Sequence, residues 1–311
     1  MLEMSSNIAI IGGGIAGIIT ALEFHDSGVD RIVVIEHEDS LGGMLKYLQR
    51  RRIKDETGEV SARDYLSQKL NALSESSVIV LKETTVVNVE RDNRVVAISP
   101  RGVVKIKSQK VILATGARFM TREELIIPGY RPAGIFTAFT ALSLLNEYRD
   151  NIGKVAIIQG THDITLEAAI KFLEKGGEIK AILENEKDVR TCDKNLVEIL
   201  AEKGVKIITN AKIIWISGDK RVNNVIYLKD NEKEQVACDT VIIGTSLVPR
   251  YELPLKLGVK FDFEKKKFHI NGIGRTNLDS VYLCGHLAYP SSSFEEVIKM
   301  GKVLVKHILT E

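Results

Sequence analysis

A glycine-rich turn near the start of the chain constrains its fold more than any other stretch. An apolar run at 8–11 leads into the letters GGGIAG at 12–17, and an apolar-periodic stretch continues to about Ser27. A second apolar run at 31–35 then ends in Glu36. A strand, a glycine turn, a helix and a second strand that ends in an acid form the pattern of a dinucleotide-binding fold.

Each residue type in this pattern has a physical reason. Gly12 permits the tight turn, and Gly14 lets the backbone approach a pyrophosphate without an intervening Cβ. Gly17 lets the helix lie close to the strand, and the helix N-terminus presents unpaired N–H groups to the phosphates. Glu36 can accept a hydrogen bond from a ribose hydroxyl. The stretch 7–36 therefore predicts a dinucleotide site.

Length and composition limit the remaining classes of function. A chain of 311 residues exceeds one typical domain, so two domains or one large sheet are expected. It has 43 basic and 41 acidic residues, a net charge of +2, which favours no nucleic-acid partner. The longest apolar runs fall short of the roughly 18 residues of a membrane span, and residues 1–7 are too short and polar for a signal peptide. A soluble, cytoplasmic protein is expected.

The cysteines do not form a redox or metal motif. Cys192, Cys238 and Cys284 lie far apart and contain no C-x-x-C spacing. We expect buried single thiols and no metal site.

Two features follow the first dinucleotide pattern. Gly42 and Gly43 lie just past the second strand and indicate a second close backbone approach to the same ligand. The basic cluster 50–54 reads RRRIK and is typical of a solvated face, with an anion site or a partner-docking site as the alternative.

Ser61 resembles the first residue of a capping box, and it predicts a helix to about Leu73.

The chain then changes to short β-rich runs. Runs within 78–107 without intervening helices indicate a small antiparallel layer inserted as a crossover. A buried strand at 110–113 ends in Ala114-Thr115-Gly116, and the punctuated stretch 119–134 reads as a linker.

A second copy of the opening architecture begins at about residue 154. A strand, a turn at Gly160, a helix and a strand ending in Glu184 repeat the first pattern. Aligning Gly160 with Gly12 places His162 at the close-approach position and Thr165 at the helix-packing position. A Cβ at either place should crowd a pyrophosphate, so we expect the second site to be altered or empty.

These elements predict an α/β protein with two Rossmann-like dinucleotide-binding domains, the second inserted in the first, each with an antiparallel β crossover. The first domain is expected to comprise 1–117 and 240–311, where a last buried strand at 281–284 and a helix at 294–309 complete it. The second domain is expected to comprise 118–239.

The motifs in this order resemble the pyridine nucleotide-disulfide oxidoreductase class of two-dinucleotide-domain flavoproteins. The resemblance extends over essentially the whole chain and includes the runs 114–116, 243–249 and 284–286. The stretch 127–138, IPGYRPAGIFTA, looks like the branch that contains sarcosine oxidase α subunits, opine oxidase A subunits and the flavoprotein associated with anaerobic glycerol-3-phosphate dehydrogenase, the last of which looks nearest.

The resemblance implies FAD in the first domain. Its binding residues, carried over by position, would be Gly12, Gly14, Ala16 and Gly17 at the pyrophosphate, Glu36 with the adjacent His37 at the adenosine ribose, Gly42 and Gly43 on the flavin side, Val87 at the adenine edge, Ala114, Thr115 and Gly116 close to the cofactor, and Gly285 and His286 near the ribityl chain. His286 stands where this class usually has an acid, which changes the charge at that position.

Electron transfer without a protein disulfide is the implied chemistry. Thiol exchange needs two nearby sulfurs, which the spacing of the cysteines does not offer, so disulfide reductase activity is not expected. NAD(P)H is the implied hydride donor, and Gly160 and Glu184 would contact it, with Glu184 favouring NAD over NADP. No catalytic side chain is assigned.

The acceptor would be a dehydrogenase partner subunit, a quinone or a dye, and homo-oligomerisation remains an alternative association. The competing hypothesis is a non-catalytic dinucleotide-binding subunit that helps to assemble a larger dehydrogenase.

Overall fold

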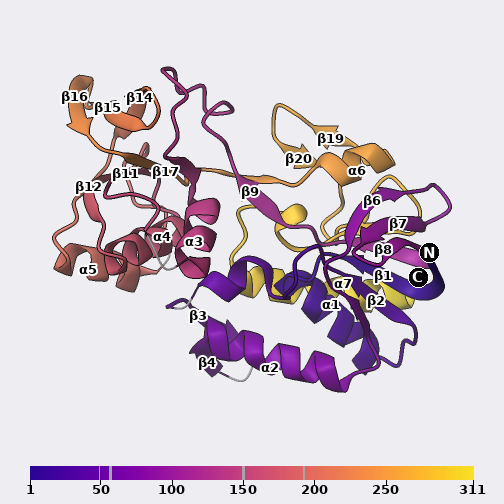
Figure 1. The fold of residues 1–311 in the computed structure, drawn as a ribbon. Helices are drawn as coiled ribbons and strands as arrows, with labels where there is room; N and C mark the ends of the chain where they lie inside the picture. Colours follow the sequence, from indigo (N-terminus) through magenta and orange to yellow (C-terminus); the bar gives the residue numbers. More distant parts are fainter. Residues whose placement is uncertain (49, 56–57, 149–150, 192) are drawn as a thin grey trace. The chain divides into compact units, whose positions relative to one another are not determined.

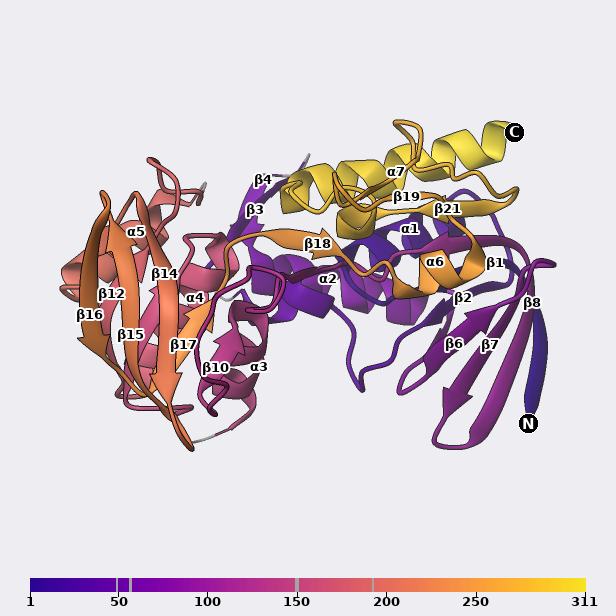
Figure 2. The same ribbon diagram turned by 90° about the horizontal axis from the view of Figure 1, so that it is seen from above.

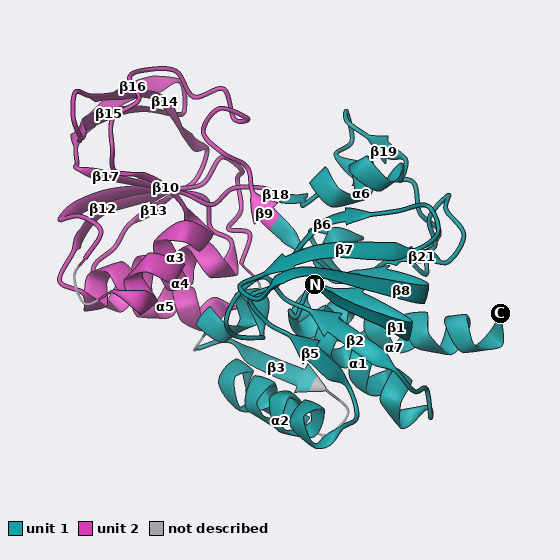
Figure 3. Ribbon diagram, turned by 45° about the vertical axis from the view of Figure 1, so that its right-hand side comes forward, with its two compact units in different colours: residues 1–117, 248–311 teal, residues 118–247 magenta. Residues whose placement is uncertain are grey.

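The computed structural model describes residues 1–48, 50–55, 58–148, 151–191 and 193–311 (Figure 1). The chain forms two compact units, of which unit 1 comprises 1–117 with 248–311 and unit 2 comprises 118–247 (Figure 3). The sequence-based boundary at 239/240 is wrong, because the strand Thr240–Ile243 hydrogen-bonds to two strands of unit 2. Residues 240–247 therefore belong to unit 2.

Unit 1 contains a seven-stranded sheet with the order β5-β2-β1-β8-β7-β6, in which β21 also pairs with β8. Its strands are β1 (Leu2–Ile11), β2 (Ile32–Ile35), β5 (Ile79–Leu81), β6 (Thr85–Val89), β7 (Arg94–Ser99), β8 (Gly102–Leu113) and β21 (Val281–Leu283). The pairs β5–β2, β2–β1, β1–β8 and β8–β21 are parallel. The pairs β8–β7 and β7–β6 are antiparallel, and β7 pairs with the first half of β8. This is a parallel nucleotide-binding sheet that continues into an antiparallel ribbon.

Helices cover one face of the parallel part of this sheet, and a β-rich layer covers the other (Figures 2 and 3). The helices are α1 (Ile15–Asp26), α2 (Ala62–Glu75) and α7 (Phe294–Thr310), with α1 packed against the other two. The smaller elements are η1 (Gly43–Tyr47), β3 (Arg52–Asp55), β4 (Gly58–Ser61), α6 (Glu252–Leu257), β19 (Phe261–Asp262), β20 (Lys267–Phe268) and η2 (Gly285–Leu287).

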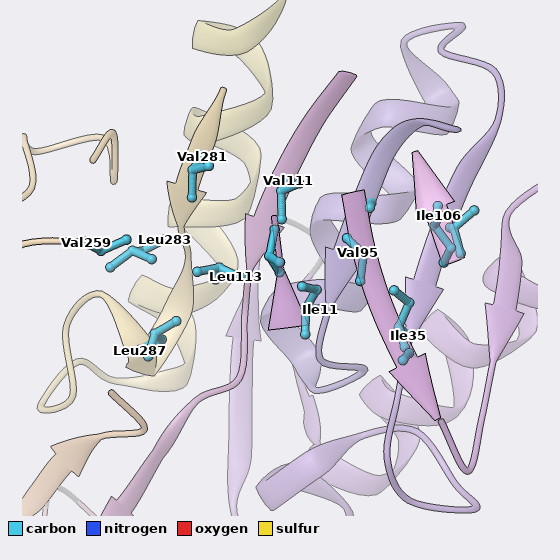
Figure 4. Packing of buried hydrophobic residues seen from close by; sticks show 14 of the residues in the cluster. Ile11, Ile35, Val95, Ile106, Val111, Leu113, Val259, Val281, Leu283 and Leu287 are labelled. Atoms are coloured by element: carbon cyan, nitrogen blue, oxygen red, sulfur yellow. The ribbon is translucent and has the colours of Figure 1, made fainter. Parts of the chain in front are cut away.

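Alternation along the strands of unit 1 determines which side chains face each layer. Ile11, Ile35, Leu113 and Leu283 point to the β-rich side, where they join Val95 and other ribbon residues in one buried cluster (Figure 4). Because successive side chains of a strand point to opposite faces, the intervening residues face the helices.

Unit 2 repeats this three-layer plan. Its five-stranded parallel sheet has the order β10-β17-β11-β12-β13. These strands are β10 (Ile135–Thr137), β11 (Val155–Gln159), β12 (Glu178–Leu183), β13 (Ile207–Ile208) and β17 (Thr240–Ile243). The helices are α3 (Ala138–Glu147), α4 (Asp163–Glu174) and α5 (Lys194–Glu202), and the antiparallel ribbon comprises β14 (Ala211–Gly218), β15 (Val222–Lys229) and β16 (Glu232–Ala237). The chain enters unit 2 in β9 (Ala117–Phe119) and leaves it in β18 (Leu247–Pro249).

The structure confirms the predicted fold class and corrects three details. Residues 79–81 form an edge strand of the main parallel sheet, not part of the antiparallel layer. The runs expected at 103–107 and 110–113 are one strand, β8, which pairs with β7 at one end and β21 at the other. The stretch 119–134 is part of unit 2, not a linker.

No helix among the described residues is long and apolar enough to cross a membrane.

Candidate dinucleotide sites

The first glycine turn has the close contacts that its sequence predicts. Gly12 has a φ of 113°, and a Cβ there would lie 2.4 Å from the carbonyl oxygen of Ala114. A Cβ at Gly17 would lie 2.0 Å from the carbonyl oxygen of Gly12, so α1 packs directly on the turn. A substituent at either position would therefore push the strand, turn and helix apart.

Gly14 has a different environment. The nearest described atom to a Cβ built there is the Cα of Gly43, at 3.9 Å. Gly14 is the N-cap of α1 and has no side-chain capping bond, so the first N–H groups of the helix remain available to a ligand. The space above Gly14 and the uncapped helix fit a dinucleotide pyrophosphate.

The pair Gly42 and Gly43 lies against this turn. The N–H of Gly42 donates to the carbonyl oxygen of Gly13 at 2.8 Å, and a Cβ at Gly43 would lie 3.1 Å from the Cα of Gly14. Both glycines have positive φ. The lack of a side chain at Gly43 thus keeps the space over Gly14 open, whereas a Cβ at Gly42 would meet Leu66.

Glu36 ends β2 with its carboxylate held against the turn. It accepts hydrogen bonds from the N–H of Gly13 at 2.7 Å and from the N–H of Glu38 at 2.9 Å. Burial raises the pKa of Glu36, but the contact with His37 and these two N–H bonds outweigh it and lower the pKa. The carboxylate is therefore ionised and already oriented when a ribose hydroxyl arrives.

His37 is the exposed partner of this acid. Its Nδ1 lies 2.6 Å from a carboxylate oxygen of Glu36. This hydrogen bond raises the pKa of His37, which burial and Arg250 lower in part. The pair places a titratable cation beside the expected adenosine ribose.

Ala114, Thr115 and Gly116 follow β8 and form the opposite side of the turn. The N–H of Ala114 donates to Ile11 at 2.8 Å, which extends the strand pairing, and Gly116 has a φ of 76°. The Oγ1 of Thr115 is buried and has no hydrogen-bond partner among the described residues. A buried hydroxyl without a partner costs free energy, so this atom also fits a ligand that supplies the missing bond.

Val87 lies on β6 at an irregularity of the β6–β7 pairing, which passes from Val86 to Asn88. Its carbonyl oxygen accepts a hydrogen bond from the Nζ of Lys256 at 2.9 Å. Bulges commonly occur next to binding sites, where they change the direction of a strand.

Gly285 and His286 lie near the end of the sequence, and the fold brings Gly285 against α1. Gly285 has a φ of 67°, and a Cβ there would lie 2.5 Å from the Cβ of Ala16. This contact explains the small residues at both positions. The Nε2 of His286 lies 3.0 Å from the carbonyl oxygen of Ser292, and its ring packs edge-on against Phe294. The His286 ring thus has partners within its own loop.

The second glycine turn repeats the backbone bonds of the first. Gly160 donates to Leu183 at 2.7 Å, as Gly12 donates to Ile35 at 2.8 Å. A Cβ at Gly160 would lie 2.2 Å from the carbonyl oxygen of Gly244, which occupies the place of Ala114.

The buried hydroxyl of Thr115 has a counterpart in unit 2. The Oγ1 of Thr245 is buried and has no partner among the described residues, and Thr245 follows β17 as Thr115 follows β8. Unit 2 therefore has the backbone and the unsatisfied hydroxyl of a nucleotide site.

Two side chains distinguish the second turn from the first. His162 is the N-cap of α4, and its Nδ1 accepts a hydrogen bond from the N–H of Ile164 at 3.4 Å while its ring contacts Phe119 edge-on. The hydroxyl of Thr165 donates to the carbonyl oxygen of Gly244 at 2.9 Å. The end of α4 is thus capped by an imidazole where the end of α1 is bare.

Glu184 is buried at the end of β12 in a network that sequence reasoning missed. The hydroxyl of Thr161 donates to its carboxylate, and the N–H of Arg190 donates to the Thr161 oxygen at 2.9 Å. The Arg190 guanidinium lies 3.7 Å from Glu184 and donates to the carbonyl oxygen of Thr245 at 3.2 Å. Aligning Thr161 with Gly13 could have identified the first of these contacts.

The described cysteines are buried single thiols, as expected, and Cys192 lies outside the described residues. Burial raises the pKa of Cys238 and of Cys284 to about 11. Both thiols are therefore protonated at neutral pH, and neither is activated as a nucleophile.

The basic cluster 50–54 is in part paired within unit 1. Arg51 contacts Glu295 at 3.3 Å, and Arg52 contacts Glu59 at 3.1 Å. Arg51 and Arg52 are thus paired with acids of their own unit.

Comparison with known proteins finds similar sequences and a similar fold. The chain is 30% identical over 185 residues to an NAD(P)H sulfur oxidoreductase (CoA-dependent) of Pyrococcus furiosus. The aligned region covers 57% of this chain and 40% of that protein. It is 22% identical to a ferredoxin–NADP reductase of Leuconostoc citreum over 93% of this chain and 86% of that protein. The crystal structure of a T. acidophilum thioredoxin reductase superposes with a TM-score of 0.75 at 17% identity and covers 98% of each chain.

The family model of pyridine nucleotide-disulphide oxidoreductases matches residues 6–302, which include both glycine turns. The chain therefore belongs to the pyridine nucleotide-disulphide oxidoreductase family, whose members are oxidoreductases that bind FAD and use NAD(P)H.

Proposed function

We propose that the chain is an FAD-dependent oxidoreductase that takes hydride from NAD(P)H and passes electrons to a partner protein or another acceptor. The geometry of the first turn is the observation that carries this proposal: a Cβ at Gly14 would meet little, α1 has no side-chain cap, and the Thr115 hydroxyl has no partner in the part of the chain that the structure describes. When bound, FAD would supply the redox chemistry, and the protein need only hold and orient it.

The roles of the unit 1 residues follow from their positions. Gly12, Gly14 and Gly17 would admit the pyrophosphate to the helix N-terminus, and Glu36 would orient the adenosine ribose. Thr115 would donate to or accept from the cofactor where β8 ends. Val87 and His286 would lie at the adenine and ribityl ends, as the resemblance implies.

Unit 2 would hold the pyridine nucleotide. Two observations support this assignment. The turn at Gly160 has the same backbone hydrogen bond as the first turn, and the buried hydroxyl of Thr245 has no partner among the described residues. Glu184 lies where an acid accepts from a ribose 2′-hydroxyl, and it would repel a 2′-phosphate, so NADH is the expected donor.

The reaction would not use a protein disulfide. Cys238 and Cys284 lie in different units and are buried, with pKa values raised to about 11. Thiol exchange requires thiolate character and access, which these two residues lack. Several relatives act on sulfur compounds by name, so this proposal separates the chain from them.

One observation favours a second candidate function, a non-catalytic subunit that binds FAD and helps to assemble a dehydrogenase. His162 caps α4 at the place where the pyrophosphate of NADH would approach. If this cap persists, the chain would hold flavin without accepting hydride from NADH.

The branch with sarcosine and opine oxidase subunits and the glycerol-associated flavoprotein remains our proposed placement within the family. Its support is the stretch 127–138. Members of such a branch would act with a partner subunit.

An absorption spectrum of the purified protein before and after anaerobic NADH tests these proposals. We expect a yellow protein whose flavin band is bleached by NADH within seconds and more slowly by NADPH. A serine variant at all three cysteines should be bleached at the same rate. A flavin that stays oxidised under millimolar NADH would contradict the NADH proposal and support the assembly role.

A further inference from the structure

A cavity in unit 2 is left unexplained by dinucleotide binding. It has a volume of about 350 Å³, within the usual range of small-molecule sites. Its lining residues are Thr121, Arg122, Glu123, Arg131, Pro132, Ile135, Phe136, Thr137, Thr140 and Ile243. Five of these come from the stretch 127–138, whose last residues include the strand β10.

The cavity lies at the carboxyl edge of the unit 2 sheet. Thr137 and Ile243 are the last residues of the paired strands β10 and β17. Ligands of open α/β sheets bind outside the carboxyl ends of the strands. Because β17 also pairs with β11, whose end leads to Gly160, the cavity lies at the same edge as the second glycine turn, against the strand next to β11.

Arg122 gives the cavity its chemical character. Its side chain is 7% exposed. Its Nε donates to the carbonyl oxygen of Ile127 at 3.1 Å, and another guanidinium nitrogen donates to Tyr130. The nearby Glu124 accepts two hydrogen bonds from the guanidinium of Arg118. No carboxylate of the described residues forms an ion pair with Arg122.

A second guanidinium, that of Arg131, lines the same cavity and is exposed to solvent. Burial lowers the pKa of Arg122, Glu123 raises it, and the charge of Arg131 lowers it further. Two guanidiniums against the single exposed carboxylate of Glu123 leave one net positive charge in the lining. Of these three charges only that of Arg122 is buried, and because buried charges in proteins are normally paired, an anionic ligand beside Arg122 would pair it.

The neutral polar groups are also donors. Thr137 and Thr140 share one hydrogen bond at 2.9 Å, and one hydroxyl hydrogen of the pair has no acceptor among the described residues. The Thr121 oxygen accepts from the N–H of Glu124 at 3.4 Å, which leaves its own hydrogen to donate. The remaining lining is apolar and includes Phe136 and Ile243.

We propose that this cavity binds a small organic acid, with its carboxylate between Arg122 and Arg131 and its carbon skeleton against the apolar wall of Phe136, Ile135 and Ile243. The bidentate geometry of guanidinium suits a carboxylate, and the apolar wall distinguishes an organic acid from inorganic phosphate. The proposal does not rest on FAD or NADH binding.

Isothermal titration of the full chain with acetate, succinate, benzoate, benzamide and phosphate tests this. We expect at least one of the three carboxylates to bind saturably, with benzamide and phosphate weaker than benzoate. Arg131→Gln should weaken carboxylate binding roughly 10- to 100-fold, the usual effect of losing a charge-assisted hydrogen bond. Lys203→Gln, which removes an exposed charge at the end of α5, should leave binding unchanged.

Trp215, the only tryptophan of the chain, gives a second readout. Its ring packs edge-on against that of Tyr130, whose carbonyl oxygen accepts from Arg122, so carboxylate binding should change its fluorescence. Arg122 holds its own loop together, and for that reason Arg131 is the variant of choice.

Absence of saturable binding by all three carboxylates, or equal binding by wild type and Arg131→Gln, would overturn the proposal. Phosphate binding as tight as benzoate would overturn the organic-acid assignment. If NADH abolished benzoate binding and Arg131→Gln weakened NADH equally, the cavity would be part of the nucleotide site and the proposal would fail.

Discussion

The two glycine turns of this chain share a backbone but differ in what occupies the start of the helix. In unit 1 the N-cap of α1 is Gly14, with no side-chain capping bond. In unit 2 the N-cap of α4 is His162, whose imidazole accepts from the N–H of Ile164. The fold therefore preserves the strand, turn, helix and acid in both units, whereas the N-cap side chain of the helix differs.

The acids at the ends of the second strands show the same contrast. Glu36 accepts from two backbone N–H groups and faces an exposed histidine. Glu184 is bonded by the Thr161 hydroxyl and approached by Arg190, which also reaches Thr245. Protein groups thus fill more of the second site than of the first, which is why we assign FAD to unit 1.

The largest effect is expected from Gly14→Val. The backbone at Gly14 has φ −71° and ψ 178°, which any residue adopts, and the nearest described atom to a Cβ lies at 3.9 Å. The protein should therefore fold, but the valine methyl groups would fill the space of the pyrophosphate and weaken FAD binding roughly 100-fold. The flavin-to-protein ratio and the Kd for added FAD measure this.

Gly272→Val is the matched control for this variant. Gly272 is exposed, and a Cβ there meets no atom within 4 Å. It should keep full flavin content. Normal flavin content in Gly14→Val would show that the first turn does not bind the pyrophosphate.

His162→Gly tests the contrast from the other side and should have an intermediate effect. Removing the imidazole exposes the N–H groups of α4, and we expect NADH to bind roughly 10-fold more tightly, with only about 0.3 kcal/mol of stability lost because glycine is itself a favourable N-cap. Anaerobic titration with NADH measures the affinity, and thermal unfolding measures the stability.

His162→Asn is the control, because asparagine is a good N-cap and keeps the helix terminus covered. Its NADH affinity should match that of the wild type. Equal affinity of the glycine variant and the wild type would show that the steric argument is wrong. Thr165 should be left in place, since its hydroxyl bonds to Gly244 and its loss would also destabilise the unit.

Sequence patterns predicted what depends on local periodicity. The strand before Gly12, the helix after it and the acid Glu36 all lie where the pattern places them, because tight turns and buried strands require particular residues within a short window. The helix after Ser61 and the last helix of the chain were located for the same reason.

The features that the sequence did not predict depend on contacts between distant residues. The continuity of β8 depends on pairing with β7 and β21, which lie on either side of it in the chain. Arg190 reaches Thr245 across 55 positions, and the cavity at Arg122 combines a loop with the ends of two strands. Residue type alone could not show that Glu124 pairs with Arg118 and not with Arg122 among the described residues.

The smallest expected effect concerns the pair Glu36 and His37, which the second turn lacks. The contact with Glu36 raises the pKa of His37 above its ordinary value of 6.5. The contact therefore contributes fully to stability below pH 6.5, and the contribution is lost as the pH rises through the raised value in the folded protein. Because the His37 side chain is 60% exposed, solvent screening limits the effect to about 0.5 kcal/mol.

His37→Gln should reduce the free energy of unfolding by this amount at pH 6 and by less at pH 9, as urea titrations at the two values would show. A His37→Gln effect that grows with pH would mean that the imidazole is not protonated by its contact with Glu36, and the charge distinction between the two turns would then rest on Arg190 alone.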